Sequence, residues 1–256
     1  MSEGAVHFEK SGSVASVVLD RPDARNAMTM AMYDQLAAAC DAVASDPEVR
    51  VATFRGAGNA FAAGTDIHEF LSFSSAEDGI VYEQRIDAAV TLIEKLPVPT
   101  IAVVEGVAMG GGLLIAAACD FRVATPVARF GVPIARTLGN CLSMANTARL
   151  VAALGVGLSK RLLLLGDAIS AEEALRCGFV LELASPDSID EAVGTLCTRL
   201  ASNAPITMRV AKESIRRLVE TLPLGDDLVR AVYASDDFKA GVRAFIAKQP
   251  PNWTGR

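Results

Sequence analysis

The chain has 256 residues, of which 51% are hydrophobic, so it is long and apolar enough to bury a large core. This composition excludes intrinsic disorder. The formal net charge of -6 comes from interspersed charges without a block of Lys and Arg, so nucleic acid is not expected as a partner.

The predicted elements of the first part of the chain alternate between strand and helix. The β-branched run 13–19 predicts a strand, and Thr29 can cap a helix that stops at Asp46-Pro47. Residues 49–54 predict the next strand. The apolar stripe expected for the helix consists of Met32, Leu36, Cys40 and Val43.

The same alternation continues in the middle of the chain. Residues 100–104 predict a strand, a run of three glycines follows, and residues 113–118 predict a helix. Further strands are expected at 121–125 and 128–132, and a helix at 143–154 that a glycine closes. This order is typical of an α/β protein.

Two capping boxes predict helix starts in the second half of the chain. In each, a serine that can accept from a backbone N–H is followed three residues later by a glutamate that can reach back. Ser170 forms this pattern with Glu173, and Ser188 forms it with Glu191. The first of the two helices is expected to end at Gly178.

Helical patterns replace strand patterns beyond about residue 186. After the helix that begins near Ser188, one more helix is expected to end near Leu222, and the stretch 228–247 is again helical in pattern. We therefore predict two regions: an α/β core over residues 1–186 and an appended helical region over residues 187–256.

Cysteine usage and the apolar segments indicate a reducing, aqueous compartment. The five cysteines lie far apart without CxxC spacing, so neither a disulfide framework nor a zinc site is expected. The first ten residues lack the pattern of a signal peptide, and the longest apolar stretch, 101–119, is interrupted by Glu105 and three glycines. We expect a cytoplasmic protein with no metal site and no membrane partner.

Two segments, 61–68 and 106–114, place glycine where a backbone approaches a ligand closely. In the second, a strand runs through Gly110, Gly111 and Gly112 into a helix, so free backbone N–H groups and the positive end of the helix dipole point into one space. Such a place stabilises negative charge. The alternative is close packing of strand against helix. The dinucleotide and P-loop fingerprints are absent, so a phosphate role has weak support.

Together with other stretches, these segments resemble the crotonase (enoyl-CoA hydratase/isomerase) superfamily over nearly the whole chain. Residues 19–27 are similar to its N-terminal signature, and residues 61–67 to its F-x-A-G-x-D-I loop. The run 99–122 is similar to its central motif. Residues 170–180 and 244–253 match its later landmarks. All five stretches occur in the family's order, which makes the resemblance specific.

The resemblance implies a spiral of ββα turns with a C-terminal helical region that builds homotrimers, commonly paired into hexamers. It implies a coenzyme A thioester as the substrate, a place in fatty acid metabolism, and no cofactor beyond the coenzyme A moiety. The chemistry it implies is stabilisation of a thioester enolate by two backbone N–H groups that form an oxyanion hole. By motif position, these donors are Thr65 and Gly111.

The same resemblance assigns a group of residues to the coenzyme A moiety. These residues are Arg25, Ala63, Asp66, Ile67, His68, Gly110 and Lys248. Structural alternatives stay open for four of them. Arg25 and Lys248 can be ordinary surface charges, and His68 a solvated loop histidine. Asp66 can be the cap of the helix that follows it.

The two catalytic glutamates of the family's hydratases are missing. Leu114 stands two residues after the glycine run where one glutamate belongs, and Ile134 follows Pro133 where the other belongs. Two glutamates placed around a water molecule let a hydratase add that water across a double bond. Ordinary two-glutamate hydration therefore lacks support in this chain.

The segment that follows, 135–146, also departs from the family pattern. It offers Arg136, Asn140, Cys141 and Ser143 as polar or reactive groups. Each has a structural alternative: Arg136 as a surface charge, Asn140 as a turn residue, Cys141 as a small buried residue and Ser143 as a helix cap. A hydrolase elbow is absent, and only two histidines are available for a nucleophilic triad.

Three functional hypotheses remain open. The first is an acyl-CoA lyase or isomerase, similar to an enoyl-CoA hydratase, that uses a nonstandard acid–base group, for which Arg136 and Asn140 are the candidates. The second is another reaction of the superfamily, such as thioester hydrolysis, decarboxylation or carbon–carbon bond cleavage. The third is an acyl-CoA-binding protein without catalytic activity.

Overall fold

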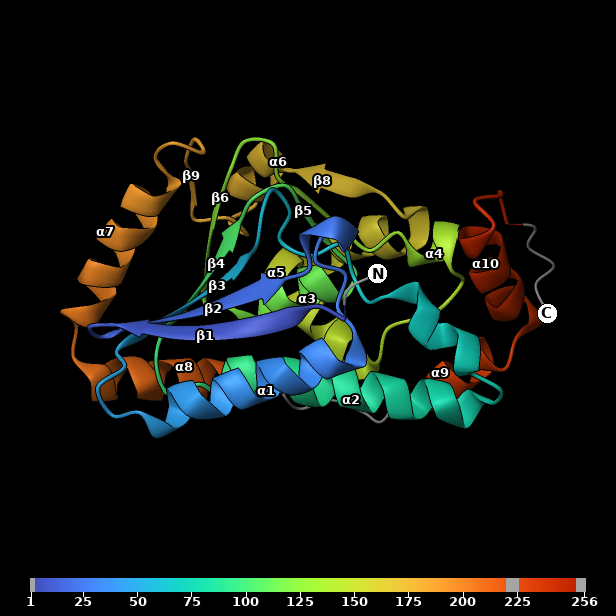
Figure 1. Ribbon diagram of the computed structural model, residues 1–256, viewed down its shortest axis with the longest axis horizontal. Helices are drawn as coiled ribbons and strands as arrows, with labels where there is room; N and C mark the ends of the chain where they lie inside the picture. Colours follow the sequence, from blue (N-terminus) through green and yellow to red (C-terminus); the bar gives the residue numbers. More distant parts are fainter. Residues whose placement is uncertain (1–2, 220–225, 252–256) are drawn as a thin grey trace.

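The β-prone runs of the sequence form neighbouring strands of one sheet (Figure 1). The structure is a computed structural model that describes residues 3–219 and 226–251. The order in this sheet is β1-β2-β3-β4-β6-β9; β1 is antiparallel to β2 and the later pairs are parallel. The strands run over Ala5–Ser11, Val14–Asp20, Val51–Gly56, Thr100–Val104, Phe121–Ala124 and Glu182–Leu183. A smaller sheet has the order β5-β7-β8, with strands Val107–Met109, Arg129–Gly131 and Ala168–Ser170.

Helices cover both faces of the larger sheet, which explains why its central strands read as continuous apolar runs. Every residue of β4 is buried. One face packs against α1 (Met30–Ser45) and α3 (Gly111–Ala118) in the main hydrophobic core. The other face packs against the apolar residues of α7 (Ile189–Ala201). The predicted α/β architecture is therefore confirmed.

Helix α1 confirms both its predicted cap and its predicted stripe. The Met32 N–H donates to Thr29 Oγ1 at 3.2 Å, as expected for a threonine N-cap. Met32, Leu36, Cys40 and Val43 are all buried. The strands predicted from the sequence also appear within two residues of their expected bounds. Strands β1, β8 and β9 had no counterpart in the prediction.

In the middle region one helix was not predicted, and the other is followed directly by a second helical stretch. Helix α2 (Ala76–Lys95) had no predicted counterpart, although Ser75 and Asp78 form a capping box at its start. The helix predicted to close at Gly155 does so, because Gly155 has a non-helical backbone with φ 74° and ψ 163°. A second helical stretch begins directly after it, so α5 (Met144–Lys160) consists of two helices joined at a kink, followed by the π-helical turn η3 (Arg161–Leu165).

Both helix starts predicted from the capping boxes are confirmed, but only one of the two serines caps its helix with its side chain. The Glu173 N–H donates to Ser170 Oγ at 3.2 Å at the start of α6 (Ala171–Arg176), and Gly178 with a φ of 78° follows that helix. Ser188 precedes α7 but its side chain does not cap it. Its hydroxyl instead lies 2.8 Å from Ser185 Oγ, which satisfies it within the turn.

The remaining helices are α8 (Pro205–Val219), α9 (Asp226–Tyr233) and α10 (Asp236–Ile246). The predicted end of a helix near Leu222 lies outside the described residues. The single pattern over 228–247 corresponds to two helices, because the chain turns at Ser235, whose hydroxyl caps α10. Among the helices of the described ranges, none combines the length and apolarity that crossing a bilayer requires.

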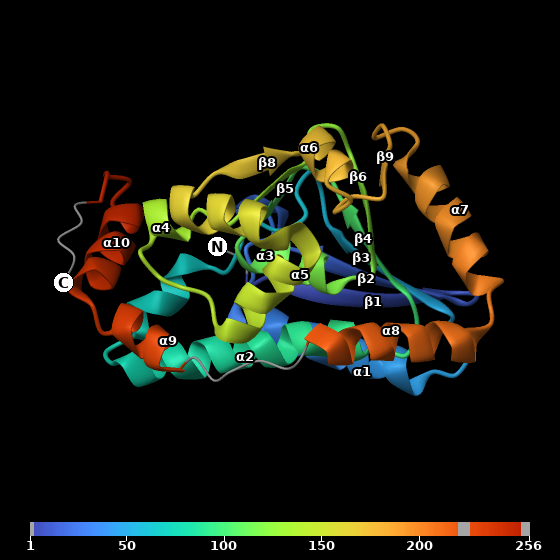
Figure 2. The ribbon, with the colours of Figure 1, turned by 180° about the vertical axis from the view of Figure 1, so that it is seen from behind.

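The last two helices dock on the predicted core. Figures 1 and 2 both show α9 beside α2, with α10 next to it at the end of the molecule opposite α7. The contact is tight, since a Cβ on Gly79 of α2 would lie 2.2 Å from the Tyr233 ring of α9. The division of the chain at residue 186 stays a prediction.

We expect Gly79→Ala to destabilise the protein by roughly 1–3 kcal/mol, because its methyl group overlaps the Tyr233 ring in a filled interface. Gly194→Ala in α7 is the matched control, because a Cβ there meets nothing within 4 Å. The control should gain about 0.5–1 kcal/mol from its higher helix propensity. Urea unfolding followed by circular dichroism measures both changes, and a Gly79→Ala protein as stable as the wild type would contradict the expectation.

Candidate active site

Two backbone segments that lie far apart in the sequence run side by side at the start of α3. The Ala62 N–H donates to the Val107 carbonyl oxygen at 3.0 Å, and the Met109 N–H donates to the Ala62 carbonyl oxygen at 2.9 Å. The Gly110 N–H donates to the Gly131 carbonyl oxygen of β7 at 2.9 Å. Backbone hydrogen bonds therefore hold the two segments in a fixed register.

Glycine is needed at this contact for two reasons. Gly64 and Gly110 have φ angles of 120° and 49°, in the region that favours glycine. Gly112 has an ordinary backbone, but a Cβ there would lie 2.3 Å from the Ala62 carbonyl oxygen. The glycines thus provide the close packing that the sequence left as an alternative. Close packing also brings backbone amides of both segments to one place.

Thr65 and Gly111 each have a backbone N–H that finds no acceptor in the part of the chain that the structure describes. The Asp66 N–H donates to the Met28 carbonyl oxygen, and the Met28 N–H to the Gly64 carbonyl oxygen, both at 2.8 Å, so the Thr65 amide points away from this pairing. Gly111 is the first residue of α3, where an N–H has no partner within the helix. A Cβ on Gly111 would lie 3.3 Å from Thr65 Oγ1, so the two residues are neighbours.

Two tyrosine hydroxyls meet the side chain of Thr65. Thr65 Oγ1 lies 3.0 Å from the hydroxyl of Tyr33 in α1 and 2.9 Å from that of Tyr82 in α2. Burial raises the pKa of both phenols, so both keep their protons in the neutral range. Sequence reasoning missed both residues: Tyr33 sits next to the predicted stripe of α1, and α2 was not predicted.

The two positions where the resemblance places catalytic glutamates are apolar in the folded chain as well. Leu114 lies in the first turns of α3 and is 2% exposed. Ile134 is the first residue of α4 (Ile134–Thr137) and packs against the main core. Any acid–base group at this site has to come from elsewhere in the chain or from the substrate.

Glu105 and Asp120, the acids close in sequence to the glycine run, are held away from it. Glu105 forms an ion pair with Arg55 at 2.6 Å. Asp120 follows the C-terminal end of α3, where it accepts from the Thr100 N–H at 2.8 Å and pairs with Lys212 at 2.7 Å. The free amides are at the other end of the same helix. Both acids are thus structural ion-pair partners.

The segment after Ile134 forms α4 and a loop that leads into α5. Ser143 caps α5 by accepting from the Asn146 N–H at 3.1 Å, and burial raises the pKa of the partly buried Cys141 thiol to about 12. The structural alternative is therefore confirmed for Ser143, whereas Cys141 is only partly buried and its role stays open. Arg136 is exposed, and Asn140 Oδ1 is buried without a hydrogen-bond partner among the described residues. The catalytic roles considered for Arg136 and Asn140 stay predictions.

Glu83 of α2 is a buried acid that the sequence analysis did not single out. It is 4% exposed, and its carboxyl accepts from the Tyr233 hydroxyl and from the Ser143 N–H, both at 2.9 Å. Burial raises the pKa of Glu83 to about 8, and the nearby Asp87 also raises it. The sequence does contain a signal for the burial of Glu83, because this residue follows the apolar Ile80 at helical spacing. It joins α2, the loop before α5 and α9.

Four of the residues assigned to coenzyme A form two contacting pairs. The Ala63 N–H donates to the carbonyl oxygen of the exposed Arg25 at 2.9 Å. Asp66 caps the short helix η2 (Ile67–Ser72) by accepting from the His68 N–H, and it lies 2.7 Å from His68 Nδ1. The role of a helix cap, which was the structural alternative for Asp66, is therefore observed. Sequence reasoning missed Arg21, a buried arginine 2.7 Å from Asp66.

The other residues assigned to coenzyme A have different surroundings. Gly110 belongs to the glycine run itself, and Ile67 packs against the aromatic cluster around Phe70 and Tyr233. Lys248 is exposed just after α10, with a φ of 53°. The structure records no contact between Lys248 and Arg25 or His68 within its described residues.

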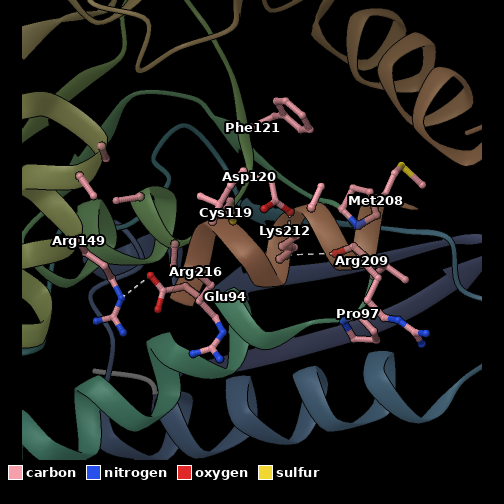
Figure 3. A pocket seen from close by; sticks show the side chains of 18 of the residues that line it. Glu94, Pro97, Cys119, Asp120, Phe121, Arg149, Met208, Arg209, Lys212 and Arg216 are labelled. Atoms are coloured by element: carbon pink, nitrogen blue, oxygen red, sulfur yellow. Dashed lines mark hydrogen bonds and ion pairs between the residues drawn. The ribbon is translucent and has the colours of Figure 1, made fainter. Parts of the chain in front are cut away.

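A cavity of about 640 Å³ lies at the opposite end of α3 from the free amides. Figure 3 shows Asp120 and Lys212 at its centre, with Arg149 on one side and Met208 on the other. It lies among the C-terminal end of α3, α5 and α8, and none of the residues predicted for the site lines it. The amide pair at the start of α3 therefore defines the candidate active site, and the cavity is a separate feature.

Comparisons with known proteins agree with the fold and the motifs. The family model described as enoyl-CoA hydratase/isomerase matches residues 9–256. The chain is 32% identical over 253 residues to a short-chain-enoyl-CoA hydratase of Clostridium acetobutylicum, covering 95% of each protein.

Two solved structures have the same fold as this chain. An enoyl-CoA hydratase/carnithine racemase of Magnetospirillum magneticum is 31% identical with a TM-score of 0.80, over 98% of this chain and 96% of that one. Methylmalonyl-CoA decarboxylase in complex with 2-nitronate-propionyl-CoA is 26% identical with a TM-score of 0.90, over 98% of each chain. Both similarities extend over nearly the full length of this chain.

The buried carboxyl of Glu83 should make stability depend on pH. Its pKa in the folded protein, about 8, lies above the ordinary value of 4.5, so the contribution of the neutral form is complete below pH 4.5 and is lost as the pH rises through 8. The free energy of unfolding should fall between these values by up to about 1.4 kcal/mol per pH unit. Glu83→Gln should remove this slope, whereas Glu9→Gln at an exposed strand position should keep it. Urea unfolding at several pH values tests this, and a Glu83→Gln protein with the wild-type slope would contradict it.

Proposed function

The chain belongs to the enoyl-CoA hydratase/isomerase family, the crotonase superfamily, and is therefore an acyl-CoA enzyme of that family. From this premise we propose that it stabilises the enolate of an acyl-CoA thioester with the backbone N–H groups of Thr65 and Gly111. The observation that carries the proposal is the pair of neighbouring amides without acceptors at the start of α3. The reaction class we propose is that of a lyase or isomerase.

The two amides can stabilise an oxygen atom on which negative charge develops. Each N–H is held by backbone hydrogen bonds of its neighbours, so it does not have to reorient when the thioester oxygen becomes negative. The N-terminal end of α3 adds the positive end of the helix dipole. A donor pair of this kind lowers the energy of an enolate relative to the neutral thioester, which is the condition for catalysis.

Decarboxylation is the second candidate that a specific observation favours. Leu114 and Ile134 replace two carboxylates with apolar side chains, and an apolar pocket destabilises the carboxylate of a malonyl-type thioester. When such a substrate reacts, the carbon–carbon bond breaks, CO2 leaves, and the electron pair forms the thioester enolate. A proton from solvent then completes the product, so no glutamate base is needed. The similarity to methylmalonyl-CoA decarboxylase supports this candidate.

The coenzyme A moiety would lie along the residues that the motifs assign to it. Arg25 and His68 are both exposed, which supports a phosphate-binding role for the arginine and the histidine. Ile67, Gly110 and Lys248 complete the proposed set. We further propose a cytoplasmic enzyme of fatty acid metabolism that uses no cofactor beyond the coenzyme A of its substrate.

A homotrimer, or a dimer of trimers, is the proposed assembly. Its support is α8, whose apolar side chains Ile206, Val210, Ile215 and Leu218 are between 56% and 81% exposed. Large exposed apolar side chains concentrated on one helix mark an interaction surface. Closed homo-oligomers are the common way to bury such a surface in soluble proteins.

Thr65→Pro tests the proposed amide, because proline lacks the N–H. Turnover in a panel of enoyl-, malonyl- and β-keto-CoA thioesters should fall by about 10²–10³-fold. Thr65→Ser is the matched control, because it keeps the amide and the hydroxyl, and circular dichroism verifies the fold of both variants. Binding without turnover of any thioester would favour a non-catalytic acyl-CoA-binding protein. Failure to bind any coenzyme A ester would overturn the proposed function.

Leu218→Glu tests the proposed assembly. A charge buried in an apolar interface is costly, so the variant should dissociate into monomers while the wild type remains a trimer or hexamer. Val127→Glu is the matched control, because Val127 is 69% exposed in a loop outside α8. Light scattering coupled to size-exclusion chromatography measures the mass, and a monomeric wild type would rule out the proposal.

A further inference from the structure

The hydroxyl of Thr65 is a meeting point of three parts of the fold. It contacts the Tyr33 hydroxyl from α1 at 3.0 Å and the Tyr82 hydroxyl from α2 at 2.9 Å. It also lies beside the start of α3, since a Cβ on Gly111 would be 3.3 Å from Thr65 Oγ1 and 2.3 Å from the Tyr33 hydroxyl. The hydroxyls of Thr65 and Tyr33 therefore adjoin Gly111, and that of Tyr82 joins them through Thr65.

The number of hydroxyl protons in this cluster determines which hydroxyl donates and which accepts in each hydrogen bond. Tyr82 donates to Thr65 Oγ1, and a single further proton lies between Thr65 and Tyr33. Tyr33 is 1% exposed, and its hydroxyl has no other acceptor within residues 3–219 and 226–251. A buried O–H without an acceptor is unfavourable, so Tyr33 donates to Thr65.

Because both tyrosines donate to Thr65, its hydroxyl can act only as a donor toward a further acceptor. A threonine hydroxyl has two acceptor lone pairs and one proton. Tyr33 and Tyr82 use both lone pairs, so the proton of Thr65 has to point away from them. Thr65 is partly exposed, in contrast to Tyr33, so its proton can reach a bound molecule.

We propose that the Thr65 hydroxyl is a third hydrogen-bond donor to the thioester oxygen of the substrate, beside the amides of Thr65 and Gly111. Tyr33 and Tyr82 are positioning residues that orient this donor. The proposal rests on the proposed enolate-stabilising function and adds a side-chain donor to it.

Two properties of the cluster support this role. A hydroxyl that accepts two hydrogen bonds becomes a stronger donor, because chains of hydrogen bonds polarise one another. The raised pKa values of Tyr33 and Tyr82 keep both phenols protonated, so the arrangement persists over the neutral pH range. The donor is a neutral group, and it lies in a site whose motif positions carry leucine and isoleucine in place of carboxylates.

The test compares ligands that differ at the thioester oxygen. The enolate probe is 2-nitronate-propionyl-CoA, a delocalised anion conjugated with the thioester carbonyl. Free coenzyme A and an S-alkyl-CoA thioether, which lacks the thioester oxygen, are the reference ligands. Dissociation constants for the full-length wild type and its variants are measured by isothermal titration calorimetry, and thermal unfolding verifies that each variant folds.

Thr65→Val keeps the shape and the amide but removes the hydroxyl. It should bind the nitronate at least about tenfold more weakly, while its affinity for coenzyme A and the thioether stays within about twofold of the wild type. Thr65→Ser should bind the nitronate within about threefold of the wild type, because it restores the O–H. Tyr33→Phe and Tyr82→Phe should show intermediate losses of about three- to tenfold, limited to the nitronate.

Tyr233→Phe is the matched control for loss of a buried tyrosine hydroxyl, because Tyr233 binds Glu83 and not Thr65. It should bind the nitronate as the wild type does. If Thr65→Val binds the nitronate as tightly as the wild type, the third donor is refuted while the amide pair stands. If the wild type itself binds the nitronate no more tightly than the thioether, both this inference and the proposed function are overturned.

Discussion

The close approach between the start of α3 and the segment that carries Thr65 is the constraint on which the candidate site depends. A Cβ on Gly112 would lie 2.3 Å from the Ala62 carbonyl oxygen, so the contact exists because that position has no side chain. The contact brings the Gly111 amide next to Thr65, and it leaves room for the Tyr33 hydroxyl against Gly111. The donors of the site are therefore products of backbone packing.

The polar groups around the start of α3 are neutral donors. Leu114 and Ile134 leave the start of α3 without an acid at the motif positions, while two amides and a hydroxyl cluster stand nearby. Neutral dipoles stabilise an anion without themselves having to change charge. The proposed decarboxylation would use these donors for an enolate whose electrons come from a bond that breaks in the substrate. The buried acid Glu83 lies elsewhere, where its hydrogen bonds connect α2 to α9 and to the loop before α5.

The sequence was sufficient for the elements and motifs that follow from local patterns. Thr29 and its helical stripe, strands β2, β3, β4 and β6 of the larger sheet, and the order of the family's motifs could all be read from neighbouring residues. Contacts between distant residues could not. The partners of Thr65 come from α1 and α2, and the partners of Glu83 from α9 and the loop before α5. Helix α2 was overlooked despite its capping box, which hid both Tyr82 and Glu83 from the sequence analysis.

The contact between Gly79 and Tyr233 couples two positions that are far apart in the chain. Because the Tyr233 ring occupies the space where a Cβ on residue 79 would lie, a side chain at 79 is compatible with this docking only if residue 233 becomes smaller. The Tyr233 hydroxyl also binds Glu83, one helical turn further along α2. Positions 79, 83 and 233 should therefore covary among homologues that dock their C-terminal helices in this way, and a chimera that exchanges the C-terminal region has to exchange all three.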